Sequence, residues 1–301
     1  MHDIIIIGGG PAGLTAAVYA RRAGKSVLVL EKSTFGGQIT WSPRVENFPG
    51  FESITGVELG DRLLGQAMGQ GAEVELEEAA GVRRDAAGFT VSCDSGVELR
   101  ARSIILATGA KPRMLGLARE TELTGSGVSY CAVCDGAFYR GRAVAVAGGG
   151  SSALQDALLL SETCKKVWLI HRRAAFRGEQ KLAEALKKRA NVEFILEATV
   201  TELLGDDTLR GIVVERRGEK RELAVDGLFI AIGSEPENSL FAPLLPLDEM
   251  GRADVGEDCA APTPGVFVAG DCRAKRVRQL TTAVADGAVA ALAAVRWLDG
   301  E

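Results

Sequence analysis

The sequence predicts an α/β protein of two domains, with the second domain inserted into the first. A short apolar run followed by a glycine-rich turn occurs twice, over residues 4–13 and 144–153. A third apolar run, residues 266–269, lies near the C-terminus without a glycine-rich turn of its own. We therefore expect this run to return to the first domain. The chain of 301 residues also exceeds the size at which a single hydrophobic core usually splits.

The first unit begins with Ile4–Ile7, an apolar run typical of a buried parallel strand. It leads into Gly8-Gly9-Gly10-Pro11-Ala12-Gly13, a G-x-G-x-x-G turn whose glycines allow a tight turn, close approach of a pyrophosphate and close packing of helix on strand. A helix is expected to end near Gly24, and the next strand ends at Glu31, an acid placed to accept hydrogen bonds from ribose hydroxyls. Strand, helix, strand and acid together predict a Rossmann-like dinucleotide-binding domain.

The second unit repeats this pattern with a different ending. Strand residues 144–147 lead into Gly148-Gly149-Gly150-Ser151-Ser152-Ala153, a G-x-G-x-x-A turn. The spacing to the end of the next strand is the same as in the first unit, so His171 stands where Glu31 stood. It opens a basic cluster of Arg172, Arg173 and Arg177. Because guanidinium groups hold a 2′-phosphate that a carboxylate repels, this second Rossmann-like domain is expected to prefer NADPH to NADH. The alternative is an exposed basic turn.

The run Cys131-Ala132-Val133-Cys134-Asp135 lies just upstream of the second glycine-rich turn. Two cysteines at this spacing can close a small redox disulfide or form half of a zinc site. Structural zinc needs four ligands, yet the chain holds no second pair and only two histidines, so the redox interpretation is favoured and no metal is expected. The other cysteines stand singly and are expected to be small buried side chains: Cys93, Cys164, Cys259 and Cys272.

Composition narrows the class of protein further. A net charge of −5 argues against a nucleic-acid partner, whose phosphates demand a basic face. The N-terminus lacks the basic start and long apolar core of a signal peptide, which predicts a cytoplasmic location. The apolar stretch Leu280–Leu298 is interrupted by Asp286 and Arg296 and is rich in alanine, which favours a closely packed core helix over a membrane span.

Taken in order, the motifs resemble those of the low-molecular-weight thioredoxin reductases, which are class II pyridine nucleotide-disulfide oxidoreductases. The resemblance covers essentially the whole chain. It rests on Gly8–Gly13, Gly36–Gln38, Val45–Gly50, Ala107–Gly109, Cys131–Gly136, Gly148–Ala153, His171–Arg177, Gly270–Asp271 and Arg278–Gln279. The glutathione-reductase-like relatives differ, because their redox pair follows the first glycine motif and they use a C-terminal catalytic histidine that this chain lacks.

The resemblance implies a discontinuous FAD domain, residues 1–114 and 242–301, interrupted by an NADPH domain, residues 115–241, that carries the redox disulfide. The FAD contacts that it implies are Gly8, Gly10, Pro11, Ala12, Gly13, Glu31, Lys32, Gly36, Gly37, Gln38, Asn47, Ala107, Thr108, Gly109, Gly270, Asp271, Arg278, Gln279 and Leu280. The NADPH contacts are Gly148, Gly150, Ser151, Ser152, Ala153, His171, Arg172, Arg173, Arg177, Ile232 and Gly233.

The family's catalytic roles map onto the cysteine run. The resemblance implies that Cys134 faces the flavin, that Cys131 attacks the disulfide of a thioredoxin and that Asp135 supplies or accepts the proton; the alternative for Asp135 is an acid at a helix start. It also implies a homodimer. One departure is Ala137, where the family commonly has the first of two aromatic residues that help to dock thioredoxin, and Phe138 could equally be core. The alternatives are a relative that uses ferredoxin or another dithiol partner, a peroxiredoxin reductase, or a flavin redox sensor without turnover.

Overall fold

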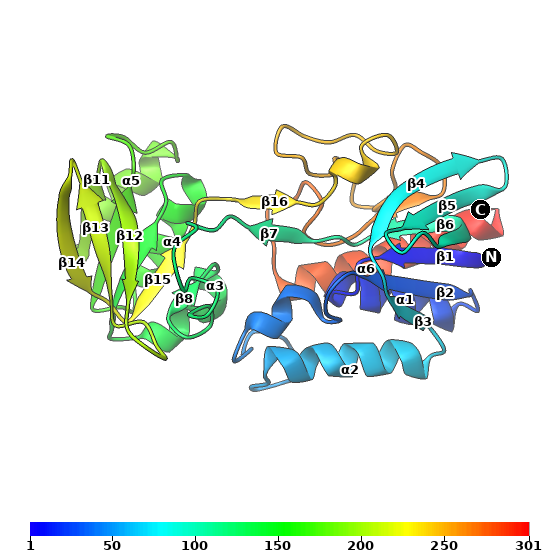
Figure 1. Cartoon of the computed structure of the whole chain (residues 1–301), viewed down its shortest axis with the longest axis horizontal. Coiled ribbons are helices and arrows are strands. Elements are labelled where there is room, and N and C mark those ends of the chain that lie inside the picture. The colour runs from blue at the N-terminus through cyan, green and yellow to red at the C-terminus, as the bar shows by residue number, and fades with distance from the viewer. Residues whose placement is uncertain (301) are drawn as a thin grey trace. The chain divides into compact units, whose positions relative to one another are not determined.

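The computed structural model describes residues 1–300. The chain forms two compact units, Met1–Lys111 with Glu235–Glu301, and Pro112–Ser234. It passes between them through β7 (Ala110–Pro112) and β16 (Ser234–Pro236), which pair in a two-stranded sheet (Figure 1). The boundaries expected from the sequence, 114/115 and 241/242, lie further along the chain. The difference at the second boundary arises because residues such as Asn238 and Phe241 are buried in the first unit.

The first unit is built on a seven-stranded sheet. Its order is β3-β2-β1-β6-β5-β4, with β17 also paired to β6. The strands are β1 His2–Ile7, β2 Val27–Glu31, β3 Glu73–Leu76, β4 Ala79–Asp85, β5 Gly88–Cys93, β6 Glu98–Leu106 and β17 Val266–Val268. The pairing of β17 with β6 is parallel and places Val266 opposite Ile104. This pairing confirms that the third apolar run returns to the first domain.

Both faces of this sheet are buried at its central strands β1, β2 and β17, as their continuous apolar sequences require. Along β1, Ile4 and Ile6 pack in one hydrophobic cluster, whereas Ile5 and Ile7 pack in the other. The helical elements are α1 Pro11–Arg22, η1 Gly37–Trp41, α2 Gly56–Gly69, η3 Ser239–Phe241 and α6 Leu280–Asp299. The expected strand and helix of the first glycine-rich unit are therefore present. The antiparallel strands β4 and β5 were not predicted from the sequence.

Helix α6 is the one stretch, among the described residues, that is long and apolar enough to cross a membrane, with a mean hydropathy of 1.2. In the structure its alanines at 290, 291 and 294 are fully buried and share a hydrophobic cluster with Ala16, Ala17 and Ala20 of α1. The contact is so close that a side chain at Gly287 would lie 2.2 Å from the carbonyl oxygen of Ala12. Small residues thus let the two helices pack closely.

The second unit contains a parallel sheet of order β11-β10-β9-β15-β8 and an antiparallel sheet of order β12-β13-β14. Its strands are β8 Val128–Ser129, β9 Ala143–Ala147, β10 Lys166–His171, β11 Val192–Leu196, β12 Ala198–Leu204, β13 Gly211–Arg216, β14 Glu219–Ala224 and β15 Gly227–Ile230. Its helical elements are α3 Ala132–Asp135, η2 Gly136–Tyr139, α4 Ser151–Ser161 and α5 Gln180–Lys187. The expected second unit is present, but the sheet β12-β13-β14 was not predicted.

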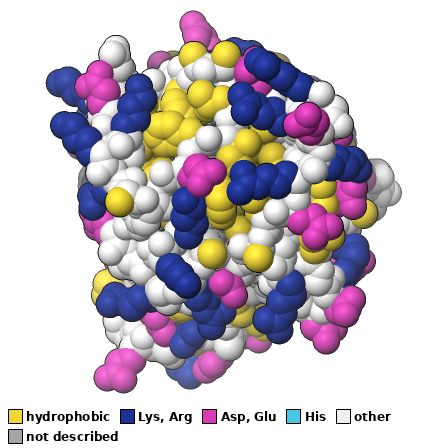
Figure 2. Space-filling view, turned by 90° about the vertical axis from the view of Figure 1, so that its left-hand side faces the viewer, with side chains coloured by type: hydrophobic (Ala, Val, Ile, Leu, Met, Phe, Trp, Pro, Cys, Tyr) yellow, Lys and Arg dark blue, Asp and Glu magenta, His cyan; other side chains and the backbone are white. Residues whose placement is uncertain are grey.

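The surface of the second unit on its β14 side carries no block of one charge. Figure 2 shows a central group of hydrophobic side chains with basic and acidic side chains interspersed around it. Ion pairs within this unit include Lys166 with Glu193 and Lys220 with Glu202. Such mixed charge is typical of a solvated surface.

Candidate active site

Cys131 and Cys134 form a disulfide, with their Cα atoms 5.3 Å apart. Cys131 is the N-cap of α3, and its Sγ accepts a hydrogen bond from the backbone N–H of Cys134 at 3.1 Å. Hydrogen bonding to the charged form lowers a pKa, so the same N–H favours a thiolate at Cys131 once the disulfide opens. Cys134 is exposed in this unit and Cys131 is half-buried.

Asp135 lies directly after the second cysteine, and most of its carboxyl is enclosed by protein. Its Oδ2 accepts a hydrogen bond from Ser129 Oγ at 2.6 Å, and its Oδ1 is buried without a hydrogen-bond partner among the described residues. Ser129 Oγ in turn accepts a hydrogen bond from the backbone N–H of Cys131 at 3.1 Å. Burial raises the pKa of Asp135 above its ordinary value, although the Ser129 hydroxyl opposes the shift. The site therefore combines an openable disulfide with an acid that binds a proton readily.

The first glycine-rich turn has the geometry that its sequence predicts. Gly8 has a φ of +113°, and a side chain there would lie 2.2 Å from the carbonyl oxygen of Ala107 at the end of β6. Glu31 is buried at the end of β2, and its Oε2 accepts a hydrogen bond from the backbone N–H of Gly9 at 2.7 Å. The N–H of Gly36 donates to the carbonyl oxygen of Gly9 at 2.8 Å. The structure thus brings Gly8–Gly13, Glu31, Gly36 and Ala107 together.

The remaining first-unit candidates lie in loops, in η1 and at the start of α6. Gln38 Nε2 donates to the carbonyl oxygen of Ala110 at 2.8 Å, next to Gly109. Asn47 Nδ2 donates to Gln279 Oε1 at 3.3 Å, and Gln279 caps α6, which begins at Leu280. The Lys32 ammonium pairs with Glu237 at 2.7 Å, so its charge is already neutralised within the protein.

One functional neighbour was missed from the sequence. Asn238 is fully buried; it accepts a hydrogen bond from Thr108 Oγ1 at 3.1 Å and donates to the carbonyl oxygen of Cys272 at 2.8 Å. It therefore ties the Ala107–Gly109 segment to the residue that follows Asp271. No motif marks this asparagine, because its role depends on contacts between segments far apart in the chain.

The second glycine-rich turn repeats the first in detail. Gly148 has a φ of +156°, and a side chain there would lie 2.4 Å from the carbonyl oxygen of Ala231, the residue after β15 and just before Ile232 and Gly233. His171 is buried at the end of β10 and lies so close to Gly149 that a Cβ on this glycine would be 2.2 Å from His171 Nδ1. The N–H of Arg177 donates to the carbonyl oxygen of Gly149 at 2.8 Å.

The basic cluster of the second unit surrounds this turn. The side chains of Arg172, Arg173 and Arg177 are exposed. His171 Nε2 is buried without a hydrogen-bond partner among the described residues. Burial lowers the pKa of His171, a hydrogen bond with the Ala175 backbone opposes this shift, and the positive charge of the three arginines adds to it. Ser151 and Ser152 begin α4 beside this cluster.

The four other cysteines, Cys93, Cys164, Cys259 and Cys272, are buried and unpaired, which confirms that they are small core side chains. Burial raises the pKa of the Cys259 thiol to about 11 and keeps it protonated. Residues 1–300 contain no group of three metal-ligating side chains close enough to hold an ion.

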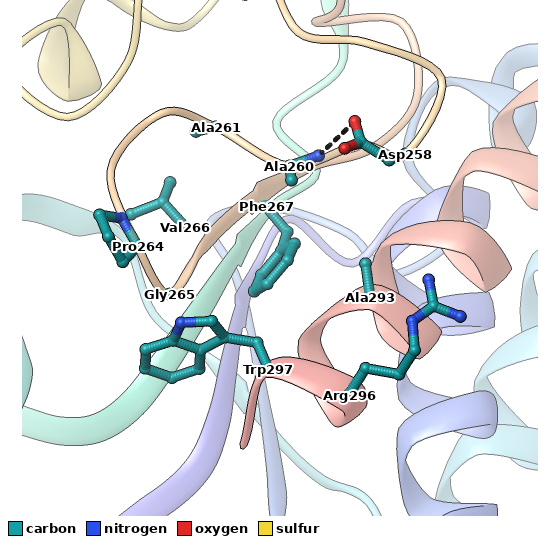
Figure 3. A pocket seen from close by; sticks show the side chains of 10 residues that line it. All are labelled: Asp258, Ala260, Ala261, Pro264, Gly265, Val266, Phe267, Ala293, Arg296 and Trp297. Atoms are coloured by element: carbon teal, nitrogen blue, oxygen red, sulfur yellow. Dashed lines mark hydrogen bonds between the residues drawn. The ribbon is translucent and has the colours of Figure 1, made fainter. Parts of the chain in front are cut away.

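A separate hollow of the first unit lies between the loop before β17 and the end of α6 (Figure 3). Phe267 and Trp297 form its apolar wall, and Asp258 and Arg296 supply its charged side chains. It contains none of the candidate residues predicted from the sequence.

Two glycine-rich turns of one design and a CxxC disulfide beside a buried acid define a two-domain disulfide oxidoreductase. The family model described as "Pyridine nucleotide-disulphide oxidoreductase" matches residues 2–287. The thioredoxin reductase of Listeria innocua is 42% identical over 302 residues, covering 99% of this chain and 94% of that protein. The thioredoxin reductase of Bacillus subtilis is 39% identical, covering 99% and 95%.

Solved structures agree with these relatives. The crystal structure of thioredoxin reductase from Streptococcus pyogenes superposes with a TM-score of 0.95 at 36% identity, covering 100% of this chain and 99% of that one. The chain belongs to the pyridine nucleotide-disulphide oxidoreductase family, among its low-molecular-weight thioredoxin reductases.

Proposed function

We propose that this protein is an NADPH-dependent thioredoxin-disulfide reductase that uses FAD in its first unit and NADPH in its second. The observation that carries the proposal is the Cys131–Cys134 disulfide beside Asp135. FAD, when bound, supplies the two-electron carrier between the nicotinamide and the disulfide.

The residues of the first unit fit FAD. Asp271 Oδ1 is buried and pairs with the Lys275 ammonium at 3.3 Å, and a carboxylate oxygen held in this way has room to accept a ligand hydroxyl as well. The turn after β1 offers backbone N–H groups at the start of α1, where a pyrophosphate binds. Glu31 at the end of β2 is placed for ribose hydroxyls.

The residues of the second unit fit NADPH. Exposed guanidinium groups follow His171, which stands where the first unit carries its acid, and such groups bind a 2′-phosphate through charge-assisted hydrogen bonds. The buried, unpartnered Nε2 of His171 is a further polar group available to the ligand. Gly150 is open, since a Cβ added there would meet no atom within 4 Å, and this leaves room for the pyrophosphate.

The chain's own residues then carry the disulfide exchange. Two electrons open the Cys131–Cys134 bond, and Asp135 is placed to hand a proton to the departing thiolate of Cys134. Cys131, stabilised as a thiolate by the Cys134 N–H, attacks the disulfide of thioredoxin and forms a mixed disulfide. Cys134 then returns its proton to Asp135 and attacks Cys131 Sγ, which closes the original bond and releases the reduced partner as a thiolate.

The partner surface shows one departure from the family. Ala137 is exposed, whereas Phe138 is half-buried and packs against the core of the second unit. A single aromatic residue beside the disulfide therefore offers less apolar area to a thioredoxin. The partner is then a thioredoxin whose docking surface fits an alanine at residue 137.

A homodimer and a cytoplasmic location belong to the same proposal. The first unit has a mostly apolar hollow whose lining includes Val18, Tyr19, Phe48, Phe51 and Val284, and a second copy would cover it. Four buried unpaired thiols suit a reducing compartment. Light scattering is expected to give twice the mass of the 31.7 kDa chain.

The test is an anaerobic titration of the protein loaded with FAD. NADPH is expected to bleach the flavin absorbance, and oxidised thioredoxin is expected to restore it. If reduced ferredoxin but not NADPH bleaches the flavin, NADPH is not the electron donor and this part of the proposal is wrong. If NADPH bleaches it and only another disulfide restores it, the partner is wrong. If nothing turns over, the protein is a sensor.

A further inference from the structure

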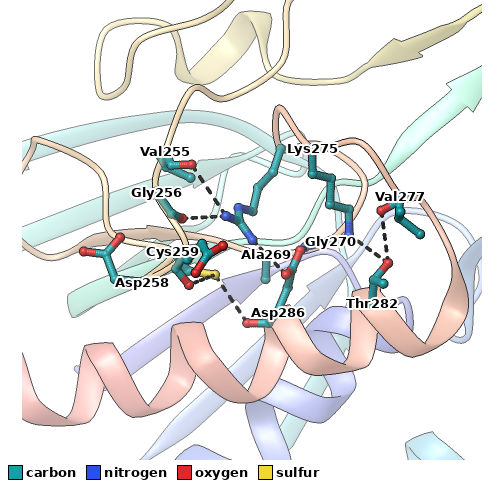
Figure 4. A network of polar contacts seen from close by, with 12 residues as sticks. Val255, Gly256, Asp258, Cys259, Ala269, Gly270, Lys275, Val277, Thr282 and Asp286 are labelled. Atoms are coloured by element: carbon teal, nitrogen blue, oxygen red, sulfur yellow. Dashed lines mark hydrogen bonds and ion pairs between the residues drawn. The ribbon is translucent and has the colours of Figure 1, made fainter.

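The segment that delivers Asp271 to the flavin site is held by a buried ionic network (Figure 4). Asp286 on α6 is its centre: Oδ2 accepts a hydrogen bond from the backbone N–H of Gly270 at 3.0 Å, and Oδ1 accepts one from Arg273 Nη1 at 2.7 Å. Lys275 Nζ lies 3.0 Å from Asp286 Oδ2 and 3.3 Å from Asp271 Oδ1. Lys275 is therefore shared by two carboxylates.

The network is balanced in charge, and three of its four side chains are enclosed by protein, whereas the Asp271 side chain is 37% exposed. The side chains of Arg273, Lys275 and Asp286 are 8%, 13% and 14% exposed. Arg273 also donates to backbone carbonyl oxygens at Val255 and Gly256. Buried charges are retained in a fold only where they are paired and hydrogen-bonded, and Arg273, Lys275 and Asp286 each contact at least two groups. Core packing does not require two cations and two carboxylates at this point.

None of these three residues lies among the flavin contacts implied by the sequence, yet all three converge on Gly270 and Asp271. We propose that Asp286 and Lys275 are positioning residues for the flavin: Asp286 fixes the backbone at Gly270, and Lys275 fixes the Asp271 carboxylate as the acceptor for a cofactor hydroxyl. This inference rests on the proposed binding of FAD by the first unit. Arg273 neutralises Asp286 and anchors it to the loop at Val255.

The two residues act differently, and the difference is measurable. Burial raises the pKa of Asp271, Lys275 and Arg278 lower it, and Asp286 raises it. Removing Lys275 therefore raises the pKa of Asp271 further, so the carboxylate acceptor is lost as the pH falls through a higher value. Removing the charge of Asp286 does not raise the pKa of Asp271, but it loosens the Gly270 backbone at every pH.

The experiment measures FAD binding to flavin-free protein by quenching of flavin fluorescence between pH 5.5 and 8.5. Lys275→Met is expected to weaken FAD binding progressively as the pH falls, whereas wild type changes less over the same range. Asp286→Asn is expected to weaken binding on the order of tenfold, the effect of one charge-assisted hydrogen bond, equally at all pH values. The exposed Asp258→Asn is the matched control, because the hydrogen bond of Asp258 goes to the backbone N–H of Ala260 and not to Gly270 or Asp271, and it should bind as wild type does.

The outcomes separate this inference from the proposed function. If wild-type protein binds no FAD, the proposed function fails. If wild type binds FAD and Lys275→Met shows the same affinity and pH profile, the inference is overturned while the function stands. A loss of FAD affinity in Lys275→Met that is the same at every pH would also overturn the inference, because it would indicate a role of Lys275 in packing alone. Should Asp286→Asn fail to fold, the profile of Lys275→Met still decides.

Discussion

The two nucleotide-binding turns share one backbone design and differ in what they leave for a ligand. In each, the carbonyl oxygen of the second glycine accepts a hydrogen bond from a later loop: Gly36 donates to Gly9, and Arg177 donates to Gly149, both at 2.8 Å. In the first turn Glu31 is already bonded to the Gly9 N–H and to Ser33. In the second, His171 Nε2 has no partner among the described residues and the nearby arginines are exposed. The two turns therefore differ in the side chains that surround them and not in their backbone fold.

The largest difference between the two units is the redox disulfide, which only the second unit carries. Cys134→Ser is expected to lower turnover with thioredoxin by about 1000-fold or more. Without the Cys134 thiol, the mixed disulfide cannot be resolved and the Cys131–Cys134 disulfide cannot form again. Reduction of the flavin by NADPH should persist, as followed by absorbance. Cys93→Ala, at a buried unpaired cysteine of the first unit, is the control and should keep its turnover. Retained turnover in Cys134→Ser contradicts the assignment.

The next comparison concerns the position of the ribose. Replacing Arg172 and Arg173 with glutamine should raise the KM for NADPH about 10- to 100-fold, the value of one or two charge-assisted hydrogen bonds. The KM for NADH should stay within about twofold, since NADH lacks the 2′-phosphate. Steady-state kinetics with both nucleotides measure the ratio. Equal losses for the two would mean that these arginines do not recognise the phosphate.

A smaller effect should come from the loop that closes over the second turn. A side chain at Gly178 would lie 2.7 Å from the Ser151 nitrogen and 2.8 Å from the Gly150 carbonyl carbon, so Gly178→Ala forces the loop outward. We expect the KM for NADPH to rise about tenfold through overpacking, with FAD content unchanged. Gly65→Ala on α2, where a side chain meets no atom within 4 Å, is the control. Loss of FAD in Gly178→Ala would show that FAD binding by the first unit depends on this loop of the second unit.

The sequence predicted those parts of the fold that depend on local patterns. Apolar runs and glycine spacing predicted β1, α1, β2 and their counterparts in the second unit, and the disulfide followed from spacing and composition. The return of β17 to the first unit was also predicted, because an apolar strand without its own turn has to pair elsewhere, but its pairing with β6 was not. What could not be predicted depends on contacts between distant segments.

Three features illustrate that limit. The strands of β12-β13-β14 do not share one burial pattern, since β13 is mostly buried and β14 mostly exposed, and no short-range pattern identified their pairing. Asn238 and Asp286 are ordinary polar residues in the sequence. Only the fold brings Asn238 into hydrogen-bond contact with Thr108, and Asp286 with Gly270. The domain boundary likewise depends on where residues 235–241 find burial, not on their composition.

Each unit also holds an aspartate whose pKa is raised by burial, and the partners of the two carboxylates differ. Asp271 is close to the cations Lys275 and Arg278, which favour its charged form, whereas the charged form of Asp135 is favoured by the Ser129 hydroxyl. Asp135 is therefore the acid suited to carrying a proton. Removing the Ser129 hydroxyl takes away the hydrogen bond that stabilises this carboxylate, so Ser129→Ala should raise the pKa of Asp135 further.

The expected result of Ser129→Ala concerns the alkaline side of the rate profile. If protonated Asp135 supplies the proton for the departing thiolate, the rate falls as the pH rises through the pKa of Asp135. In Ser129→Ala the midpoint of this fall should lie about one pH unit higher, the value of one hydrogen bond. Rapid-mixing measurements of disulfide reduction across pH give the profile. Ser129→Thr keeps the hydroxyl and should restore the wild-type midpoint. A midpoint that is unmoved in Ser129→Ala would show that Asp135 does not limit this step, and would leave it as the acid of a helix start.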